Sequence, residues 1–319
     1  MNGSILYRLT VIILFAGSLT QVSAAGLSGH PGAFADVGLG LRSIGMGGAY
    51  SALAGDENAA RWNPAMLTEV LGYNAGFTWT RQFSLIDYHY LAFAVPIERD
   101  RPGLGVGGYV VTAGDDVYRE TTFALSAGVG AAKLKLPVPD LNFGVTVKMR
   151  TVNFGSNADG GDDRVTGDAL GYGMDIGLHY RFTPAVSAAL VMRDLVNDIK
   201  WSSSVRGDYC EGVPRRLVLA AAVEKEKLVL GMEYQPGLYG DVPDRMRVGG
   251  EFTLLGILRP RFGLAQDLAS GDVNRWITLG LGIELTSSFL RPFRKVSVGY
   301  THMLHEIDPT PRVGLAITW

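Results

Sequence analysis

The last eight residues of the chain restrict its fold more than any other stretch. They read Arg312-Val313-Gly314-Leu315-Ala316-Ile317-Thr318-Trp319. In an extended strand the apolar residues and Trp319 share one face, and the residues between them share the other. A strand edge of this kind would be prone to aggregation in water. The pattern therefore predicts the closing strand of a β-barrel whose outer face contacts lipid, with the terminal aromatic residue at the membrane interface.

The start of the chain predicts export. Arg8 precedes an apolar run over 9–19, and Val22-Ser23-Ala24 forms a small-residue cleavage site. The apolar run is too short to cross a bilayer as a helix. We therefore interpret residues 1–24 as a secretory signal peptide, with an N-terminal anchor helix as the alternative.

The C-terminal pattern agrees with export to an outer membrane. Its spacing resembles the insertion signal of bacterial outer-membrane proteins and rests on four residues: Arg312, Gly314, Ile317 and Trp319. This resemblance implies a location in the bacterial outer membrane, with membrane lipid and the barrel-assembly machinery as partners.

Composition excludes several other classes. A net charge of −2 gives no electrostatic argument for a nucleic-acid partner. Cys210 is the only cysteine, so the chain has no internal disulfide. No apolar run after residue 25 is long enough for a spanning helix, although 47% of the residues are hydrophobic. Those residues must lie in a core or face lipid on alternating strands.

The chain from residue 73 to 319 reads as strands of about ten residues separated by turns. The predicted strands cover 73–80, 88–96, 103–113, 120–131, 141–153, 168–182, 185–193, 214–224, 227–235, 245–254, 259–267, 273–285, 293–301 and 312–319. These are about fourteen, an even number, which places both ends of the barrel on one side. The prediction is an all-β, transmembrane, antiparallel up-and-down barrel, expected to be a monomer.

One face of each predicted strand is polar or glycine-rich. Over 168–182, Asp175, His179 and Arg181 alternate with glycines on the face opposite the apolar residues. That face suits a wet or plugged lumen better than the dry core of a sandwich. These three residues are therefore a candidate polar network in the lumen. A soluble sandwich or barrel with one solvated face is the alternative.

Residues 25–72 lack this alternation and are rich in Gly and Ala. Short helices or turns packed by small residues are expected here, with a helix stopping or restarting at Pro64. A barrel of about fourteen strands is wider than its own side chains can fill. The segment is therefore predicted to be a compact, partly helical hatch that plugs the lumen.

The hatch carries a motif of small and aromatic residues. It consists of Gly45, Gly47, Gly48, Asp56, Trp62, Asn63, Pro64 and Ala65. It resembles the N-terminal hatch of the FadL-type outer-membrane proteins, and most of all the PorV/PorQ-like branch. The resemblance implies one of two functions. FadL-type members pass hydrophobic molecules such as fatty acids, whereas PorV-like members carry proteins at the type IX secretion machinery.

Glycine pairs mark possible kinks in the wall, since a kinked strand lets a hydrophobic ligand leave sideways. Gly107-Gly108 and Gly249-Gly250 are the candidates, although simple packing of glycine against a crowded lumen is the favoured interpretation. The long connection 194–213, which carries Trp201, is expected to be an outer loop and the leading surface for a protein partner.

No chemistry beyond binding or passage is favoured. His302, His305 and Glu306 lack the spacing of a helical zinc site. No nucleophile, base and acid set is found, and no cofactor or metal is expected. Three functions remain open: a barrel that binds or passes hydrophobic small molecules, a partner barrel in protein secretion, and, as a minor alternative, an outer-membrane enzyme.

Overall fold

The computed structural model describes Phe34 and residues 37–98, 103–155, 165–239, 242–268, 274–286, 292–305 and 308–319. The predicted signal peptide over 1–24 lies outside the described residues. The described part contains fifteen strands: β1 (Asn74–Gln82), β2 (Ile86–Pro96), β3 (Leu104–Gly114), β4 (Tyr118–Gly130), β5 (Leu141–Phe154), β6 (Gly167–Thr183), β7 (Val186–Ser203), β8 (Gly207–Glu211), β9 (Arg216–Lys225), β10 (Leu228–Gln235), β11 (Arg245–Phe252), β12 (Leu258–Asp267), β13 (Arg275–Leu285), β14 (Lys295–Leu304) and β15 (Thr310–Thr318).

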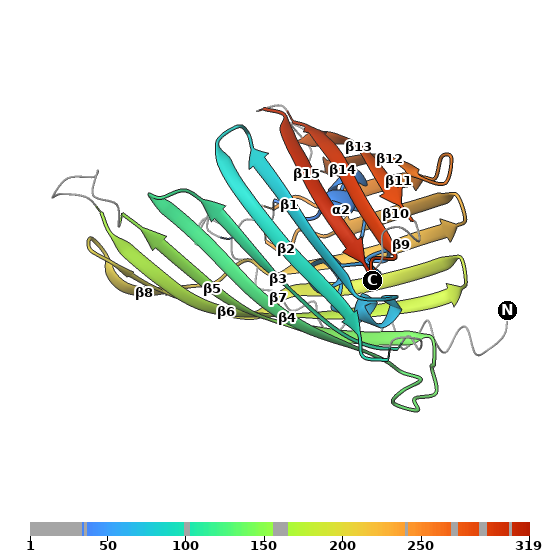
Figure 1. The fold of residues 1–319 in the computed structure, drawn as a ribbon. Coiled ribbons are helices and arrows are strands. Elements are labelled where there is room, and N and C mark those ends of the chain that lie inside the picture. The colour runs from blue at the N-terminus through green and yellow to red at the C-terminus, as the bar shows by residue number, and fades with distance from the viewer. Residues whose placement is uncertain are drawn as a thin grey trace.

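Fourteen of these strands form a closed antiparallel barrel (Figure 1). Neighbours along the chain pair with each other, and β1 pairs with β15 to close the ring. The remaining strand, β8, pairs only with the far end of β7, so β9 takes its place in the wall. This confirms the predicted fold class. We call the rim beside Trp319 the terminal rim and the opposite one, with the turn between β1 and β2, the distal rim.

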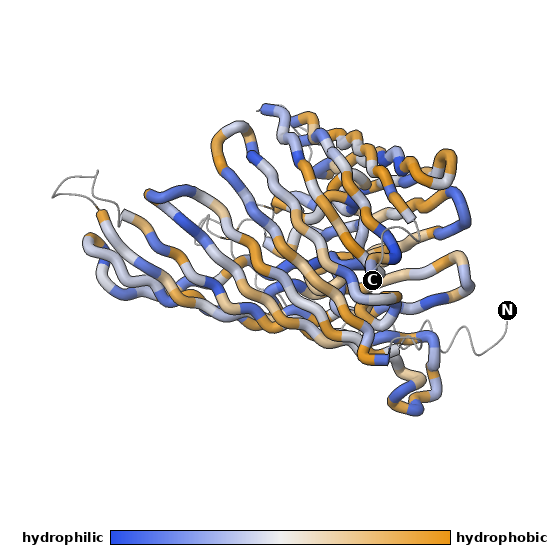
Figure 2. Tube along the Cα trace, viewed as in Figure 1, coloured by the Kyte–Doolittle hydropathy of each residue, from blue (hydrophilic) through white to orange (hydrophobic). Residues whose placement is uncertain are grey.

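The two faces of the wall follow the alternation of the sequence (Figure 2). Leu170 and Tyr172 of β6 face outward and are more than half exposed, while Gly171 and Gly173 between them are buried. Leu279 of β13 also faces outward and is 55% exposed. An outer surface of this kind would not be stable in water, but it is the surface a lipid-facing barrel requires.

The residues between Val37 and Gly72 lie inside the barrel, and we call them the luminal segment. It contains three short helices: α2 (Leu41–Gly45), α3 (Ala59–Trp62) and η2 (Pro64–Glu69). Glycines on the inner wall leave room for its backbone, because a Cβ there would collide with it. Gly144 lies against Pro64, Gly249 against Met46, and Gly263 against Gly47. The packing is close enough to need wall positions without side chains.

One detail of the prediction was wrong. Residues 194–203 are not a loop, because β7 continues to Ser203 and turns back as β8. The glycine pairs do not mark kinks, since β3 and β11 pair in continuous register with both neighbours, and packing against a crowded lumen was the favoured interpretation. Gly107 instead makes room for Leu67 of the luminal segment, and Gly250 faces outward under Phe262.

None of the helices in the described ranges combines the length and apolar character needed to cross a membrane.

Candidate functional site in the barrel lumen

The glycines of the hatch motif shape the bend after α2. Gly47 and Gly48 both have positive φ, 66° and 77°, a region that other residues rarely adopt. A Cβ on Gly47 would lie 2.8 Å from the backbone nitrogen of Leu264. A Cβ on Gly45 would lie 2.9 Å from the side chain of Arg261. The glycines therefore allow the luminal segment to lie directly on the wall.

Trp62 and Asn63 tie parts of the luminal segment together. The indole nitrogen of Trp62 donates to the carbonyl of Leu39 at 2.9 Å, and its ring meets Tyr50 edge to face. The Asn63 amide donates to the carbonyls of Ser51 and of Leu178 on the wall.

The last two residues of the motif begin the next helix. The oxygen of Asn63 accepts a hydrogen bond from the Ala65 nitrogen, which caps η2 at its start. Pro64 occupies the first turn of η2, where its missing N–H does no harm. Ala65 is fully buried. Trp62, Asn63, Pro64 and Ala65 therefore form one turn whose packing leaves no space for larger side chains.

Asp56 belongs to a cluster of charges facing the terminal rim. It accepts a hydrogen bond from the Tyr50 hydroxyl and forms an ion pair with Arg42 at 3.4 Å. Arg42 also pairs with Glu251 of the wall at 2.9 Å. Next to Asp56, burial raises the pKa of Glu57 to about 7. The cluster holds the luminal segment to β11 by charge as well as by packing.

The structure divides the predicted polar network into two parts. His179 and Arg181 lie near Glu69 of the luminal segment, and Arg181 pairs with Glu69 at 2.9 Å. Asp175 lies farther toward the distal rim and pairs with Lys148 at 2.6 Å. The turn at Asn63 and Pro64 separates the two groups, because it packs on Gly177.

The residues of the predicted insertion signal occupy different environments. Arg312 faces the lumen, is 1% exposed, and donates to the carbonyl of Val37 at 3.1 Å. Gly314 lies against the backbone of Phe77, and Ile317 alternates with it on β15. Trp319 packs edge to face on both Tyr73 and Phe293 at the terminal rim. Arg312 therefore also anchors the luminal segment, a role that its position in the sequence did not reveal.

The wall is interrupted in the middle of β7. On one edge, β7 pairs with β9 up to Arg193 and with β8 from Ile199. On the other edge, Asp175 of β6 faces three residues of β7 instead of one, which is a bulge. Asp194 within the bulge has a φ of 54°.

At this interruption, hydrogen bonds from the Asn197 side chain replace the backbone hydrogen bonds that are missing between β7 and the residues before β9. Asn197 donates to the carbonyl of Val213 at 3.1 Å and accepts from its nitrogen at 2.6 Å. Outside the wall, Leu238 of the β10–β11 loop joins a cluster with Leu195 and Leu217. We call residues 194–198 and 212–215 the wall break. Few backbone hydrogen bonds hold the barrel closed there.

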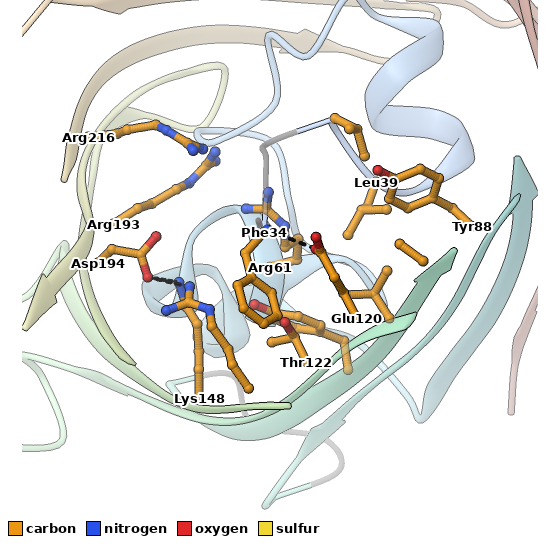
Figure 3. Close-up of a pocket in the computed structure, with 15 residues that line it drawn as sticks. Phe34, Leu39, Arg61, Tyr88, Glu120, Thr122, Lys148, Arg193, Asp194 and Arg216 are labelled. Carbon is orange, nitrogen blue, oxygen red and sulfur yellow. Dashed lines mark hydrogen bonds and ion pairs between the residues drawn. The ribbon is translucent and has the colours of Figure 1, made fainter. Parts of the chain in front are cut away.

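A cavity of about 60 Å³ lies on the distal side of the luminal segment, against the wall break (Figure 3). One of its walls is apolar and aromatic, formed by Phe34, Val37, Leu39, Tyr88, Tyr109 and Val111. Charged side chains line the rest, namely Arg61, Lys148, Arg150, Arg193, Arg216 and Asp194, while Glu120 lies on the side of Leu39 and Tyr88 and accepts a hydrogen bond from the Phe34 nitrogen. The cavity is therefore amphipathic, with cations in excess of carboxylates.

Arg150 keeps spare hydrogen-bonding capacity in this cavity. It is 4% exposed, and its Nη2 pairs with Asp194 at 2.5 Å. Its Nε and Nη1 have no hydrogen-bond partner among the described residues, although both are buried. The ring of Phe34 lies 5.4 Å from the guanidinium carbon. Two buried donors without partners are costly, so they form a site for an acceptor such as a carboxylate.

A second cavity of about 170 Å³ lies on the other side of residues 37–40. Phe83, Trp276 and Met303 line it, with Arg245 stacked over the Trp276 ring at 4.6 Å. Its size is close to that of a cavity that holds one benzene ring, about 150 Å³. Trp276 therefore lines a cavity near the distal rim.

Sequence reasoning missed the charged cluster around Arg150 and the wall break. The signal for the first was visible, since Lys148 and Arg150 both fall on the lumen face of one strand and need carboxylates. The partner Asp194 comes from a strand two positions away, and only the register reveals it. Among the described residues, no group of three His, Cys, Asp or Glu side chains is placed to hold a metal ion.

Comparison with known proteins adds to this description of the fold. No protein-family model matches the sequence, and no curated protein matches it. Among solved structures, the chain is similar to the CymD monoaromatic hydrocarbon channel, with 16% identity, a TM-score of 0.60, and coverage of 89% of this chain and 97% of that one. It is also similar to the Pseudomonas putida toluene transporter TodX, with 15% identity, a TM-score of 0.57, and coverage of 88% and 96%. At these identities the likeness shows a shared barrel fold over nearly the whole length of each protein.

Proposed function

We propose that this protein is a barrel of the bacterial outer membrane that binds and passes hydrophobic small molecules with an anionic head, such as fatty acids. The terminal rim then faces the periplasm and the distal rim faces the outside. The outward apolar surface supports the location. The names of the similar channels, which concern hydrocarbons, support a hydrophobic ligand.

The single observation that carries this proposal is Arg150 in its amphipathic cavity. Apolar side chains on one wall suit a hydrocarbon chain or ring. The unpaired Nε and Nη1 of Arg150 suit an anionic head such as a carboxylate, because a hydrogen bond between two charged groups is stronger than one between neutral groups. A neutral hydrocarbon would leave these donors without a partner. The ligand we propose is therefore an amphiphile that carries a carboxylate.

The cavity beside Arg150 is too small for a ligand in this structure. About 60 Å³ is less than half of what a single benzene ring needs. In this proposal the luminal segment closes the barrel, and passage requires part of it to move. We propose that residues 25–72 act as a hatch, and that the ligand leaves through the wall break beside Asp194 rather than through the lumen.

A binding experiment tests the proposal directly. The full chain in lipid nanodiscs is titrated with a long-chain carboxylate and with the alcohol of the same length. Arg150→Gln should weaken carboxylate binding about tenfold or more, since hydrogen bonds to charged groups contribute roughly 1.5–3 kcal/mol. Binding of the alcohol should not change. Arg259→Gln, which breaks an ion pair with Glu284 near the terminal rim, is the matched control. Equal losses for both ligands, or none, would contradict the proposal.

A second candidate function is a PorV-like role as a partner barrel for secreted proteins. The β7–β8 hairpin projects at the distal rim together with β5 and β6 (Figure 1). Trp201 and Tyr209 stack there, and Arg206 lies 4.2 Å over the Tyr209 ring. Aromatic residues and arginine are enriched at the centres of protein interfaces. A photo-crosslinker placed at position 206 on intact cells should capture an exported protein, while the same probe at Glu226 should not.

A further inference from the structure

The turn between β11 and β12 at the terminal rim exposes an unusual set of apolar residues. Leu254 is 43% exposed, Leu255 is 88% exposed and Ile257 is 42% exposed. Leu255 is the most exposed large hydrophobic side chain of the described residues. Turns at barrel rims that face water normally carry polar residues. This turn therefore needs a surrounding other than water.

The backbone fixes Leu255 in this exposed position. Leu254 and Leu258 exchange two backbone hydrogen bonds of 2.9 Å, which close a tight hairpin. Leu255 and Gly256 both have positive φ, 51° and 74°. Tight turns with this geometry favour Asn, Asp or Gly at the first of these positions. Leucine is disfavoured in this positive-φ conformation, and the closed turn keeps its side chain exposed.

The exposed turn continues the outward apolar surface of the wall. Phe252 and Leu254 precede the turn, and Leu258 and Phe262 follow it. All four side chains lie on the outer side of the wall, and Leu254 is directly opposite Leu258. The outward positions between them are Gly250 and Pro260, so no polar side chain interrupts the row. The apolar surface thus runs from the middle of the barrel to the tip of this hairpin.

The neighbouring hairpin has the opposite character. The end of the β9–β10 hairpin carries Glu224, Lys225, Glu226 and Lys227, and Figure 2 shows its hydrophilic tip beside the hydrophobic tip of β11–β12. These two turns are adjacent on the rim, because β10 pairs with β11. A difference this sharp between adjacent turns indicates that they lie at different depths.

A second apolar turn lies on the far side of the ring. Between β4 and β5, Leu134 is 51% exposed and Leu136 is 42% exposed, next to Lys133 and Lys135. Lysine stems beside apolar groups let the charged ends reach a polar boundary. A lipid leaflet surrounds the whole barrel and meets both turns, whereas one folded partner would have to span the barrel mouth.

We infer that the β11–β12 turn is inserted in the lipid leaflet at the terminal rim, with Leu255 among the acyl chains and the β9–β10 turn in water. The inference rests on the outer-membrane location proposed above. It assigns Leu255 to lipid rather than to a protein partner, and it predicts that the terminal rim is not level with the membrane surface.

A depth measurement tests this. Cys210→Ser removes the only native cysteine, and an environment-sensitive fluorophore is then attached through Leu255→Cys, Glu226→Cys or Leu279→Cys. The full chain is reconstituted in vesicles of phosphatidylethanolamine and phosphatidylglycerol. Quenching is compared between nitroxides on the lipid acyl chains and iodide in the buffer. The label at 255 should be quenched by acyl-chain nitroxide about as strongly as the label at 279. It should be quenched by iodide several-fold less than the label at 226.

The label at 279, which faces outward in mid-strand, separates two kinds of failure. If label 279 is in lipid and label 255 is quenched by iodide like label 226, the inference about the turn is overturned and the proposed location stands. If label 279 is also quenched by iodide, the location itself fails. These vesicles hold no other protein, so lipid is the only surrounding other than water that the label at 255 can enter. A water-exposed label at 255 therefore counts directly against insertion of the turn in lipid.

Discussion

At the scale of single residues, glycine decides where the luminal segment can lie. Gly249 meets the carbonyl of Met46 so closely that no side chain fits between them. Its place in a strand was correctly predicted, but its purpose could not be, because a glycine in a strand is compatible with a kink, a bulge or a close approach. Only the position of the facing backbone distinguishes these cases.

Gly249→Val should therefore displace the luminal segment. An added side chain in a close-packed site destabilises the folded state by about 1–3 kcal/mol. We expect the luminal segment to move away from the wall, because the strands are held by their backbone hydrogen bonds. Hydrogen exchange of the amides in residues 41–50 should become faster, while the strands remain protected. Gly55→Ala is the control, because its added Cβ meets only ordinary contacts from 3.7 Å. Unchanged exchange in the Gly249 variant would contradict the close packing described here.

The environment of Glu57 predicts that docking of the luminal segment depends on pH. Burial raises its pKa from the ordinary 4.5 to about 7, with a further contribution from Asp56. An undocked segment would release this proton near pH 4.5, but the docked one keeps it up to about pH 7. Docking is therefore strongest below pH 4.5 and weakens as pH rises toward 7.

Proteolysis of the luminal segment should accordingly be faster at pH 8 than at pH 5, at matched protease activity. Glu57→Gln removes the titrating proton, and the difference between the two pH values should shrink. A wild-type protein with equal protection at both pH values would show that Glu57 does not control docking.

At the scale of elements, alternation in the sequence predicted the strands and their faces, since side chains on a strand alternate with a period of two. It failed at β7 because the bulge at Asp194 breaks that period. The predicted strand ended at residue 193, just before the bulge. The second half of β7 then looked like a loop, although Ile199 and Trp201 point inward on the same face. Bulges depend on the partner strand, which the local sequence does not show.

The wall break can be tested as a route by closing it. In the Cys210→Ser background, Asn197→Cys and Val213→Cys place two thiols where a side chain now bridges β7 and the start of β9. Oxidation should slow the transfer of a fluorescent fatty acid into the vesicle membrane by severalfold, and reduction should restore it. Transfer that is insensitive to the crosslink would exclude this route. The single-cysteine variants control for the labelling itself.

At the scale of the whole molecule, the outward face of the barrel carries the apolar side chains that a lipid surrounding requires. The strand number followed from the spacing of the strand-like segments in the sequence. The closed ring followed from their alternation, because the apolar face of each strand had to lie against lipid or a core. The position of the luminal segment was predicted only as a plug. Its contacts, such as Arg42 with Glu251, join residues far apart in the chain and could not be predicted.

Leu279→Arg should cost about 2–4 kcal/mol if that residue lies near the middle of the membrane. Reversible folding into lipid vesicles, followed by denaturant titration, measures the change. Lys295→Arg, which keeps a charge near the rim, serves as the comparison. A neutral result for Leu279→Arg would indicate that water, not lipid, meets this face.

Ion conductance across a planar lipid bilayer tests the central claim most directly, that a lipid-embedded barrel is closed by its own N-terminal segment. The complete protein should show no steady open current. Deletion of residues 26–72 should leave a barrel that inserts and conducts small ions continuously. Equal conductance from the two proteins would contradict the account.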